Sequence, residues 1–313
     1  MHSHHSHSGS YVSHAVDDLD SVVAKAYVMG FTQFCLTEHM PRFDSKYMYP
    51  EEIVKGYDCK TLNTIFEQYE THARRLQLEY KDKMMILVGF EVEGADLDHI
   101  EHAVKLKSRF DMIVGSVHHA LGEPIDFDED LWRKARDHTD SKTSRELYKR
   151  YYEMQHTMID KLKPDVVGHF DLISLFQPQD DVDPTTGKNV MNIDMETDWP
   201  EVWAQIVKNI ELAASYGGLF ELNSAAIRKG WATPYPKPVI AHAILDHGGR
   251  FCLSDDSHGM KQIGLNYHKV LEYVKELQLK EVYYLVREDH HTVVCSISTQ
   301  ELEKSPFWDQ YKN

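Results

Sequence analysis

The stretch MILVGFEVE (residues 85–93) is an apolar run with β-branched residues that ends in two glutamates. A short, nearly continuous apolar run of this kind is typical of a strand buried on both faces. The same pattern, an apolar run that ends in histidine, aspartate or glutamate, recurs along the chain. It gives seven candidate strands, the others being a stretch around His5–His7 and the segments FCLTEH (34–39), MIVGSVHH (112–119), VVGHFD (166–171), LFELNS (219–224) and FCLSDDSH (251–258).

Segments with the 3.6-residue apolar period of amphipathic helices separate these strands. Strands that alternate with helices favour a parallel sheet, and the sequence has no Pro/Gly-rich linker that would divide it. We therefore expect an α/β fold, a closed seven-stranded barrel formed by one domain over residues 1–313. It would carry an inserted loop near 177–197 and a C-terminal extension at 280–313. The expected helices are Ser21–Met29, Thr61–Tyr80, Ser144–Leu162, Trp199–Tyr216, Pro238–Asp246 and His268–Leu277.

The composition limits the possible partners. The 313 residues include 34 Lys and Arg against 50 Asp and Glu, a formal net charge of −16. This charge disfavours a nucleic acid or an anionic membrane as partner. No apolar run approaches the ~18 residues of a transmembrane helix, and the start MHSHHSHSGS lacks the apolar core of a signal peptide. The 4 cysteines form no CxxC pair, so we expect a cytoplasmic protein with reduced thiols.

The polar residues that end the candidate strands point to one common site. In a parallel α/β barrel, the carboxyl ends of all strands meet on one face, where active sites are built. A single histidine is a weak signal, but here the histidines and acids follow successive strands. The residues expected on this rim are His5, His7, His39, Glu91, His118, His169, Glu221, Asp256 and His258.

Imidazole and carboxylate ligands without a thiolate suit Zn, Mn or Fe. Residues i and i+2 of a strand point to the same face, which pairs His5 with His7 and Asp256 with His258. Glu91 can bridge two ions with its two oxygens. These histidines and acids offer more ligands than one ion can use, so we expect two to three divalent transition metals. Such sites bind phosphoryl oxygens and generate hydroxide near neutral pH, which predicts a phosphoesterase.

The motifs also resemble those of a known family. The pair His5-Ser-His7 with His14 downstream, followed by LTEH (36–39), GFE (89–91), GSVHH (115–119), GHFD (168–171) and SDDSH (254–258), resembles, in order, the motifs of the PHP (polymerase and histidinol phosphatase) superfamily. ELNSAAIRKG (221–230) is similar to a stretch of its histidinol phosphatases, and the opening HSHHSHSG resembles the fungal type. The resemblance covers roughly residues 2–260 and implies a distorted, TIM-like (β/α)7 barrel.

The resemblance also implies a trinuclear metal site. Either His2/His4 or His5/His7 provides the first pair, and we favour His5/His7 because His2 is close enough to the terminus to fray. His119 and Glu93 are near-duplicates of two implied ligands. By position, the first metal takes His5, His7, Glu91 and Asp256, the second shares Glu91 and adds His118 and His169, and the third takes His14, His39 and His258.

The implied substrate is L-histidinol phosphate, a small phosphate ester of histidine biosynthesis. Arginine suits bidentate phosphate binding, so Arg228 is the first candidate, followed by Arg42 and Lys229. We expect hydroxide generated at the metals to attack phosphorus in line, with Arg228 stabilising the phosphoryl charge and Asp256 or His258 handling the proton of the leaving group. Candidate partners for the amine and imidazole of the substrate are Glu221, Asp171, Tyr235 and Trp231.

Three alternatives compete with this hypothesis. The first is a phosphoesterase of the same superfamily that acts on another small phosphomonoester or a nucleotide. The second is a metal-binding regulatory barrel without turnover, which the full set of ligand types disfavours. The third is a metal-dependent amidohydrolase, which also uses an H-x-H motif but is expected to have eight strands. A barrel fold alone does not decide among substrates.

Overall fold

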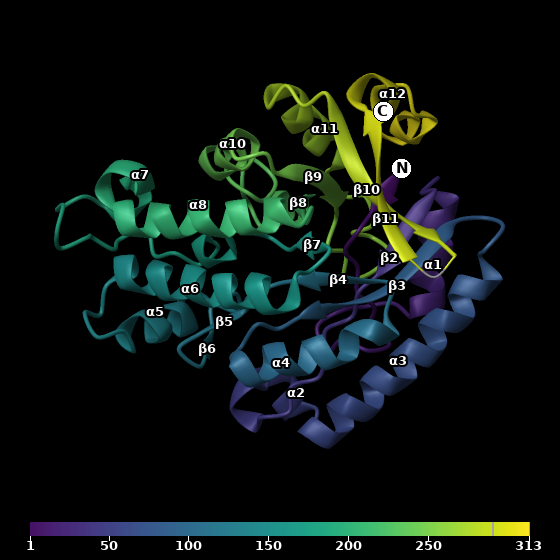
Figure 1. Ribbon diagram of the computed structural model, residues 1–313. Helices are drawn as coiled ribbons and strands as arrows, with labels where there is room; N and C mark the ends of the chain where they lie inside the picture. The colour runs from purple at the N-terminus through teal and green to yellow at the C-terminus, as the bar shows by residue number, and fades with distance from the viewer. Residues whose placement is uncertain (290, 313) are drawn as a thin grey trace.

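The computed structural model describes residues 1–289 and 291–312, and its centre is a parallel seven-stranded sheet in the order β1-β2-β3-β4-β7-β8-β9 (Figure 1). The first and last strands approach each other, because Ser6 pairs with Ser257 and the His4 amide donates to the Leu253 carbonyl at 3.2 Å. The sheet is therefore a nearly closed barrel. Its strands are β1 (His2–Ser3), β2 (Gln33–Leu36), β3 (Met85–Val92), β4 (Met112–Gly115), β7 (Val166–Val167), β8 (Leu219–Asn223) and β9 (Arg250–Ser254).

The seven-stranded barrel predicted from the sequence is confirmed. One boundary differs, since β1 ends at Ser3 and His5 and His7 follow it instead of lying within it. A two-stranded hairpin after β4, formed by β5 (His119–Ala120) and β6 (Glu123–Pro124), was not predicted. Its strands are too short to show an apolar period.

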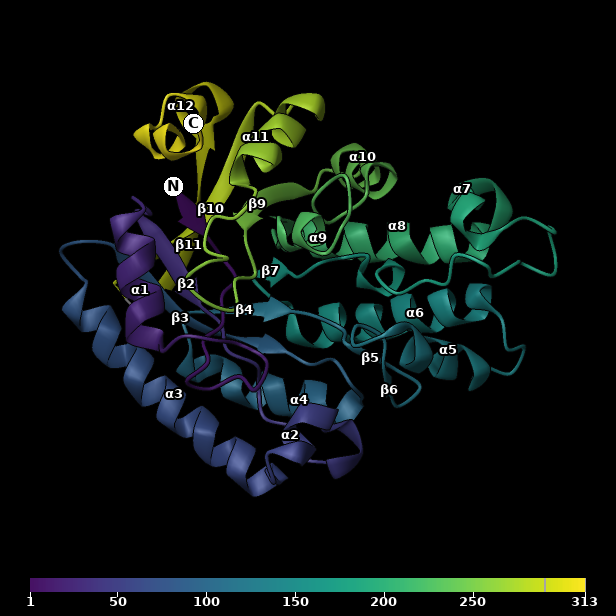
Figure 2. The same ribbon diagram turned by 180° about the vertical axis from the view of Figure 1, so that it is seen from behind.

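The helices cover the outside of the barrel (Figures 1 and 2). The Asp58 side chain caps the start of α3 by accepting from the Thr61 amide at 2.7 Å. Gly30 follows the end of α1 with a φ of +88°, a conformation that favours glycine. The helices are α1 (Leu19–Val28), α2 (Pro50–Val54), α3 (Cys59–Glu79), α4 (Leu97–Leu106), α5 (Glu129–Asp137), α6 (Ser144–Leu162), α7 (Met195–Asp198), α8 (Pro200–Ser215), α9 (Ala225–Arg228), α10 (Pro238–Asp246), α11 (Tyr267–Glu276) and α12 (Thr299–Glu303). The six predicted helices correspond to α1, α3, α6, α8, α10 and α11, whereas α2, α4, α5, α7, α9 and α12 were not predicted.

The predicted insertion at 177–197 lies between the 3₁₀ helix Leu172–Ser174 and α8. It contains a second short 3₁₀ helix, Val190–Asn192, and most of α7. In Figure 1 it forms the end of a lobe, on the left, built from α5, α6 and α8. Within the described residues, no helix is both long enough and apolar enough to cross a membrane.

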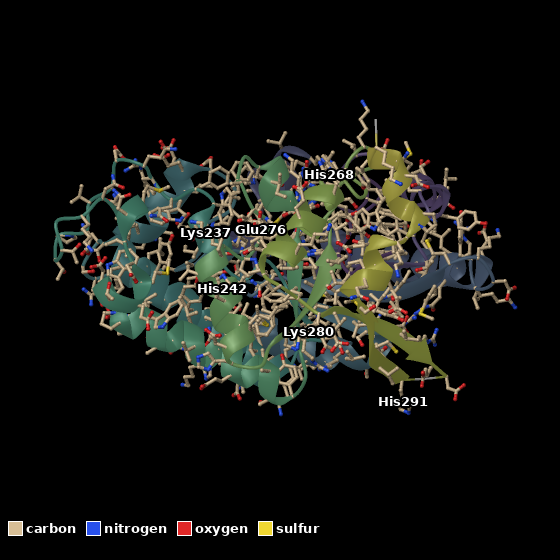
Figure 3. All side chains as sticks on the ribbon, turned by 90° about the horizontal axis from the view of Figure 1, so that it is seen from above. Lys237, His242, His268, Glu276, Lys280 and His291 are labelled. Atoms are coloured by element: carbon tan, nitrogen blue, oxygen red, sulfur yellow. The ribbon has the colours of Figure 1, made fainter. Side chains whose placement is uncertain are left out.

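The C-terminal extension forms an antiparallel hairpin of β10 (Glu281–Glu288) and β11 (His291–Ser298), followed by α12 and the 3₁₀ helix Pro306–Tyr311. In Figure 3, His291 marks the start of β11 at the lower right, away from α10 with His242 and α11 with His268 and Glu276. Leu285 of β10 enters the barrel interior, where it packs on residues of six strands. Phe307 packs on Phe31 at 4.9 Å between ring centroids. The extension therefore completes the core of the barrel.

Candidate functional site

A cavity of about 470 Å³ opens at the carboxyl ends of the parallel strands. The strands bring residues from both ends of the chain to this rim, as expected for an α/β barrel. Most of the residues predicted from the strand ends line it. The lining is formed by His14, His39, Tyr49, Glu51, Glu91, His118, Asp126, Phe127, His169, Leu172, Arg228, Lys229, Asp256, His258 and Gln262.

Glu91, near the end of β3, lies at the centre of the cluster. Its Oε2 is 3.2 Å from His5 Nε2 and 3.3 Å from His7 Nε2. The same two nitrogens face Asp256 Oδ1, at 3.7 Å from His5 and 3.4 Å from His7. These four side chains are those that the family resemblance implies for a first metal, and the fold brings them together.

The second oxygen of Glu91 faces the next pair of histidines. Glu91 Oε1 is 3.2 Å from His118 Nε2 and 2.9 Å from His169 Nε2. The Ser116 hydroxyl donates to the same oxygen at 2.7 Å. Glu91 thus lies between two groups of imidazoles, the position that a bridging carboxylate requires.

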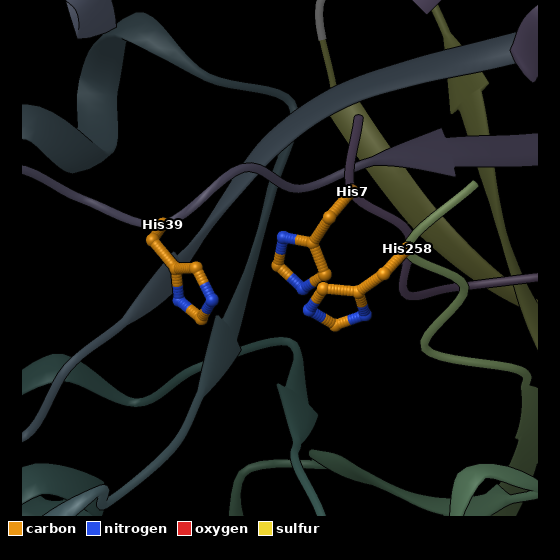
Figure 4. A group of neighbouring side chains, drawn as sticks. All are labelled: His7, His39 and His258. Carbon is orange, nitrogen blue, oxygen red and sulfur yellow. The ribbon is translucent and has the colours of Figure 1, made fainter. Parts of the chain in front are cut away.

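The third group lies on the open side of the cavity. The rings of His39 and His258 each lie 4.4 Å from the ring of His7 (Figure 4). His14 Nε2 is 3.0 Å from His258 Nε2. Two neutral ring nitrogens at this distance need a proton or a cation between them.

Carboxylates behind the cluster fix the orientation of several rings. Glu221 Oε2 is 3.2 Å from His5 Nδ1, and Glu51 Oε1 is 3.2 Å from His14 Nδ1. Asp256 follows β9 with a φ of +46°, which is uncommon for a residue other than glycine. Strained backbone of this kind is often found at functional sites.

The cluster concentrates negative charge that calls for compensating cations. Burial by itself would raise the pKa of Glu91, but His5, His118 and His39 outweigh it and hold that pKa well below its usual value. For Asp256, burial is likewise outweighed by His5 and His7, and its pKa is also low. Burial opposes a charge on His7, yet Asp256, Glu38 and Glu91 raise its pKa to about 10. Without metal, His5, His7 and His118, whose pKa values are raised, therefore carry the positive charge, whereas burial and the neighbouring His7 lower the pKa of His258.

The donor atoms of the cluster fit divalent metal ions. Several buried ring nitrogens that face the cluster have no hydrogen-bond partner within the described residues, among them His5 Nε2, His7 Nε2 and His39 Nε2. Buried polar atoms are normally paired, so an unpaired set of this kind indicates a missing ligand. Groups of donors within 4.8 Å of one another include His5, His7 and Glu91, then Glu91, His118 and His169, and also His7, His39 and His258.

Two alternative residues from the sequence lie outside the cavity. His4 Nδ1 bonds the Leu253 carbonyl at 3.0 Å and His4 Nε2 accepts from the Leu285 amide at 3.1 Å, so His4 joins the hairpin to the barrel. His119 packs near Tyr47, with 5.2 Å between ring centroids, and burial lowers its pKa to about 3. The geometry favours His5 over His4 and His118 over His119.

Of the three cationic side chains proposed to bind phosphate, the structure places two at the cavity and one outside it. Arg228 and Lys229 line the cavity. Arg42 does not line it, because this buried guanidinium pairs with Glu93 at 2.6 Å and also with Glu52. The expectation that Arg42 binds phosphate is therefore corrected, since its charge is already neutralised behind His39.

The four partners proposed for the organic part of the substrate are also displaced from the cavity. Glu221 lies behind His5 and accepts from the His169 amide at 2.6 Å. Asp171 accepts from the Lys237 amide at 3.0 Å. Tyr235 is fully buried and packs against Trp231, with 4.7 Å between ring centroids. None of these four lines the cavity, and this expectation is wrong.

The family model of the PHP domain matches residues 3–225. The chain belongs to the PHP-domain family. Histidinol-phosphatase of Saccharomyces cerevisiae is 38% identical over 333 residues, covering 98% of this chain and 99% of the relative. The protein named Probable histidinol-phosphatase of Schizosaccharomyces pombe is 40% identical over 274 residues, covering 87% of this chain and 85% of the relative. The resemblance inferred from the motifs is confirmed.

A solved structure extends this likeness to the fold. Histidinol phosphate phosphatase of Lactococcus lactis, in complex with zinc, L-histidinol and phosphate, matches with a TM-score of 0.64 at 19% identity. The match covers 93% of this PHP-domain chain and 98% of the other. At this level of identity, the comparison supports the barrel architecture.

Six of the cavity-lining residues did not follow from the sequence, namely Tyr49, Glu51, Asp126, Phe127, Leu172 and Gln262. They lie on loops and short helices outside the strand ends. The only usable signal was the acidic segment IDFDED (125–130), which follows a strand whose end carries two histidines.

Proposed function

We propose that this chain hydrolyses L-histidinol phosphate to L-histidinol and phosphate, a step of histidine biosynthesis, with two to three divalent transition metals such as Zn, Mn or Fe. The observation that carries the proposal is the 38% identity to a histidinol-phosphatase over 98% of the chain. The convergence of all nine implied ligands at one end of the barrel supports it. The cytoplasmic location expected from the sequence stays a prediction.

The proposed ligands form three sets that share side chains. When bound, divalent ions would polarise the phosphoryl oxygens and lower the pKa of water. Glu91 lies where it can join two sets through its two oxygens. The sets are His5, His7, Glu91 and Asp256, then Glu91, His118 and His169, and finally His14, His39 and His258.

Arg228 is the proposed phosphate clamp. Its Nη2 donates to the Asp256 carbonyl at 3.0 Å and its Nη1 to the Asp255 carbonyl at 3.3 Å, which fixes the guanidinium at the edge of the cavity. A held guanidinium is well placed to stabilise charge that develops on the phosphoryl oxygens. Lys229 adds a second, exposed positive charge at the mouth of the cavity.

Asp256 and His258 are the proposed groups that move the proton to the leaving alkoxide. Both line the cavity, and His258 Nδ1 lies 3.6 Å from Asp256 Oδ1. His258 Nδ1 hydrogen-bonds the Asp256 backbone carbonyl at 2.9 Å, which holds the two residues together next to the cluster that would bind the phosphate. Glu221 keeps the ring of His5 in place without entering the cavity.

Steady-state phosphate release tests the function. L-histidinol phosphate, p-nitrophenyl phosphate and a nucleoside monophosphate should be compared on one sample whose metal content is measured. We expect a far higher kcat/KM for L-histidinol phosphate. Equal, slow turnover of all three would leave a phosphoesterase and remove the specific substrate, and no turnover with metals bound would favour a regulatory barrel.

A further inference from the structure

The wall of the cavity beyond His118 is formed by the end of the hairpin after β4. The Ile125 amide donates to the His118 carbonyl at 2.9 Å, which fixes this segment beside the metal cluster. Three residues further on, Asp128 caps α5 by accepting from the Leu131 amide at 2.8 Å. Asp126 and Phe127 lie between these two anchors and line the cavity.

Asp126 differs from the other acids that line the cavity. Glu91 and Asp256 face histidines of the metal cluster, and Glu51 pairs with His14. Asp126, in contrast, has no ion-pair partner within the described chain, and its Oδ1 is buried without a hydrogen bond; Oε2 of Glu51 is also unpaired, but its Oε1 is held by His14. A buried carboxylate oxygen left unpaired at the wall of a binding cavity is costly unless a ligand satisfies it.

An aromatic surface lies beside this carboxylate. Phe127 is 39% exposed although it is a large apolar side chain. Its ring centroid is 6.4 Å from that of Tyr49, which in turn lies 6.4 Å from the ring of His14. The aromatic wall therefore runs from the metal cluster to Asp126, along the path that an extended phosphate ester would follow.

We propose that Asp126 determines specificity by binding the cationic, amine-bearing end of the substrate, with Phe127 packing against its imidazole. This inference rests on the proposed function. In L-histidinol phosphate, the amine is attached to the carbon next to the CH2–O group, and the imidazole follows one carbon further. With the phosphate at the metal cluster and Arg228, these N–H groups face the opposite wall, where an anionic acceptor forms a charge-assisted hydrogen bond.

The test compares two substrates and two inhibitors. For Asp126→Asn and Asp126→Ala, kcat/KM should fall about 10- to 100-fold with L-histidinol phosphate. With p-nitrophenyl phosphate, which has neither amine nor imidazole, both variants should keep the wild-type value. The Ki of L-histidinol should rise by a similar factor, while the Ki of inorganic phosphate stays unchanged. The matched control is Asp130→Asn, which removes an exposed charge of α5 outside the cavity.

Three results would overturn the proposal. Parallel losses on both substrates would make Asp126 a structural residue, and wild-type values on both would make it irrelevant to binding. An unchanged Ki of L-histidinol would exclude contact with the organic end of the substrate. If the wild-type enzyme itself does not prefer L-histidinol phosphate, the proposed function fails first, and the assignment of Asp126 fails with it.

Discussion

His5 Nδ1 lies 3.2 Å from Glu221 Oε2, while His5 Nε2 lies 3.2 Å from Glu91 on the opposite side of the ring. The carboxylate of Glu221 accepts the Nδ1 proton and so leaves Nε2 free to face the cluster. A carboxylate behind a ligating histidine fixes its tautomer and raises its basicity. Glu221 is thus a positioning residue. The substitution Glu221→Gln tests this role, because it removes the negative charge and keeps the shape of the side chain.

We predict that Glu221→Gln lowers metal affinity about 10- to 100-fold with the fold retained, because glutamine keeps the shape but loses the charge. Metal titration measures the effect directly, apart from activity. The control is Glu211→Gln, which alters an exposed pair at 3.0 Å between Glu211 and His247. Equal metal affinity in the Glu221 variant and the wild type would contradict the positioning role.

Arg228→Ala should raise KM for the phosphate ester about tenfold or more, since a charge-assisted contact to the substrate is lost. Arg228→Lys should recover only part of the loss, because lysine cannot form two parallel hydrogen bonds. Steady-state kinetics measures both variants. Arg250→Ala serves as control, since Arg250 also donates to a carbonyl, that of Gly217 at 2.6 Å, outside the cavity. An unchanged KM for Arg228→Ala would rule out a phosphate clamp.

Arg42→Met should destabilise the protein by about 3–5 kcal/mol, because Glu93 and Glu52 remain buried without their shared cation. Urea unfolding measures the change in the free energy of unfolding. Arg133→Met is the matched control, since Arg133 also pairs with two carboxylates but at the surface, and its loss should cost about 1 kcal/mol or less. If Arg42→Met keeps its stability and raises KM, Arg42 binds phosphate after all.

The two neighbouring histidines of the N-terminal motif should give opposite results. His4→Ala should lower the stability by about 1–3 kcal/mol, because the Leu285 amide loses its imidazole acceptor and the Leu253 carbonyl keeps only the hydrogen bond from the His4 backbone amide, and metal content should not change. His5→Ala should lose metal instead. Thermal unfolding and metal analysis of both variants separate the roles, and metal loss in His4→Ala would assign the motif to the other pair.

The strands and their rim were predictable because the sequence repeats one physical pattern, an apolar run followed by metal-binding side chains. The choice between His4 and His5 was not. The side-chain alternation of a strand applies only while the strand lasts, and β1 ends at Ser3. Only the closure of the barrel against Leu253 shows which ring faces the cavity.

The role of the cations and acids depended on contacts that the sequence does not show. Arg42 follows His39 closely, but Glu93 and Glu52, from two other segments, neutralise it. Asp126 reaches the cavity only because the Ile125 amide bonds the His118 carbonyl. Long-range pairing of this kind leaves no periodic signal, and the same holds for Leu285 in the barrel core.

Phosphate release from L-histidinol phosphate by Asp256→Asn tests most directly that this cluster is the catalytic site. Asparagine keeps the shape of the side chain and tolerates the left-handed backbone of this position, so the fold should survive. We predict a loss of about 100-fold or more in kcat, with thermal stability retained and with full activity in the exposed control Asp246→Asn. Near-wild-type turnover by a folded Asp256→Asn enzyme would contradict the assignment.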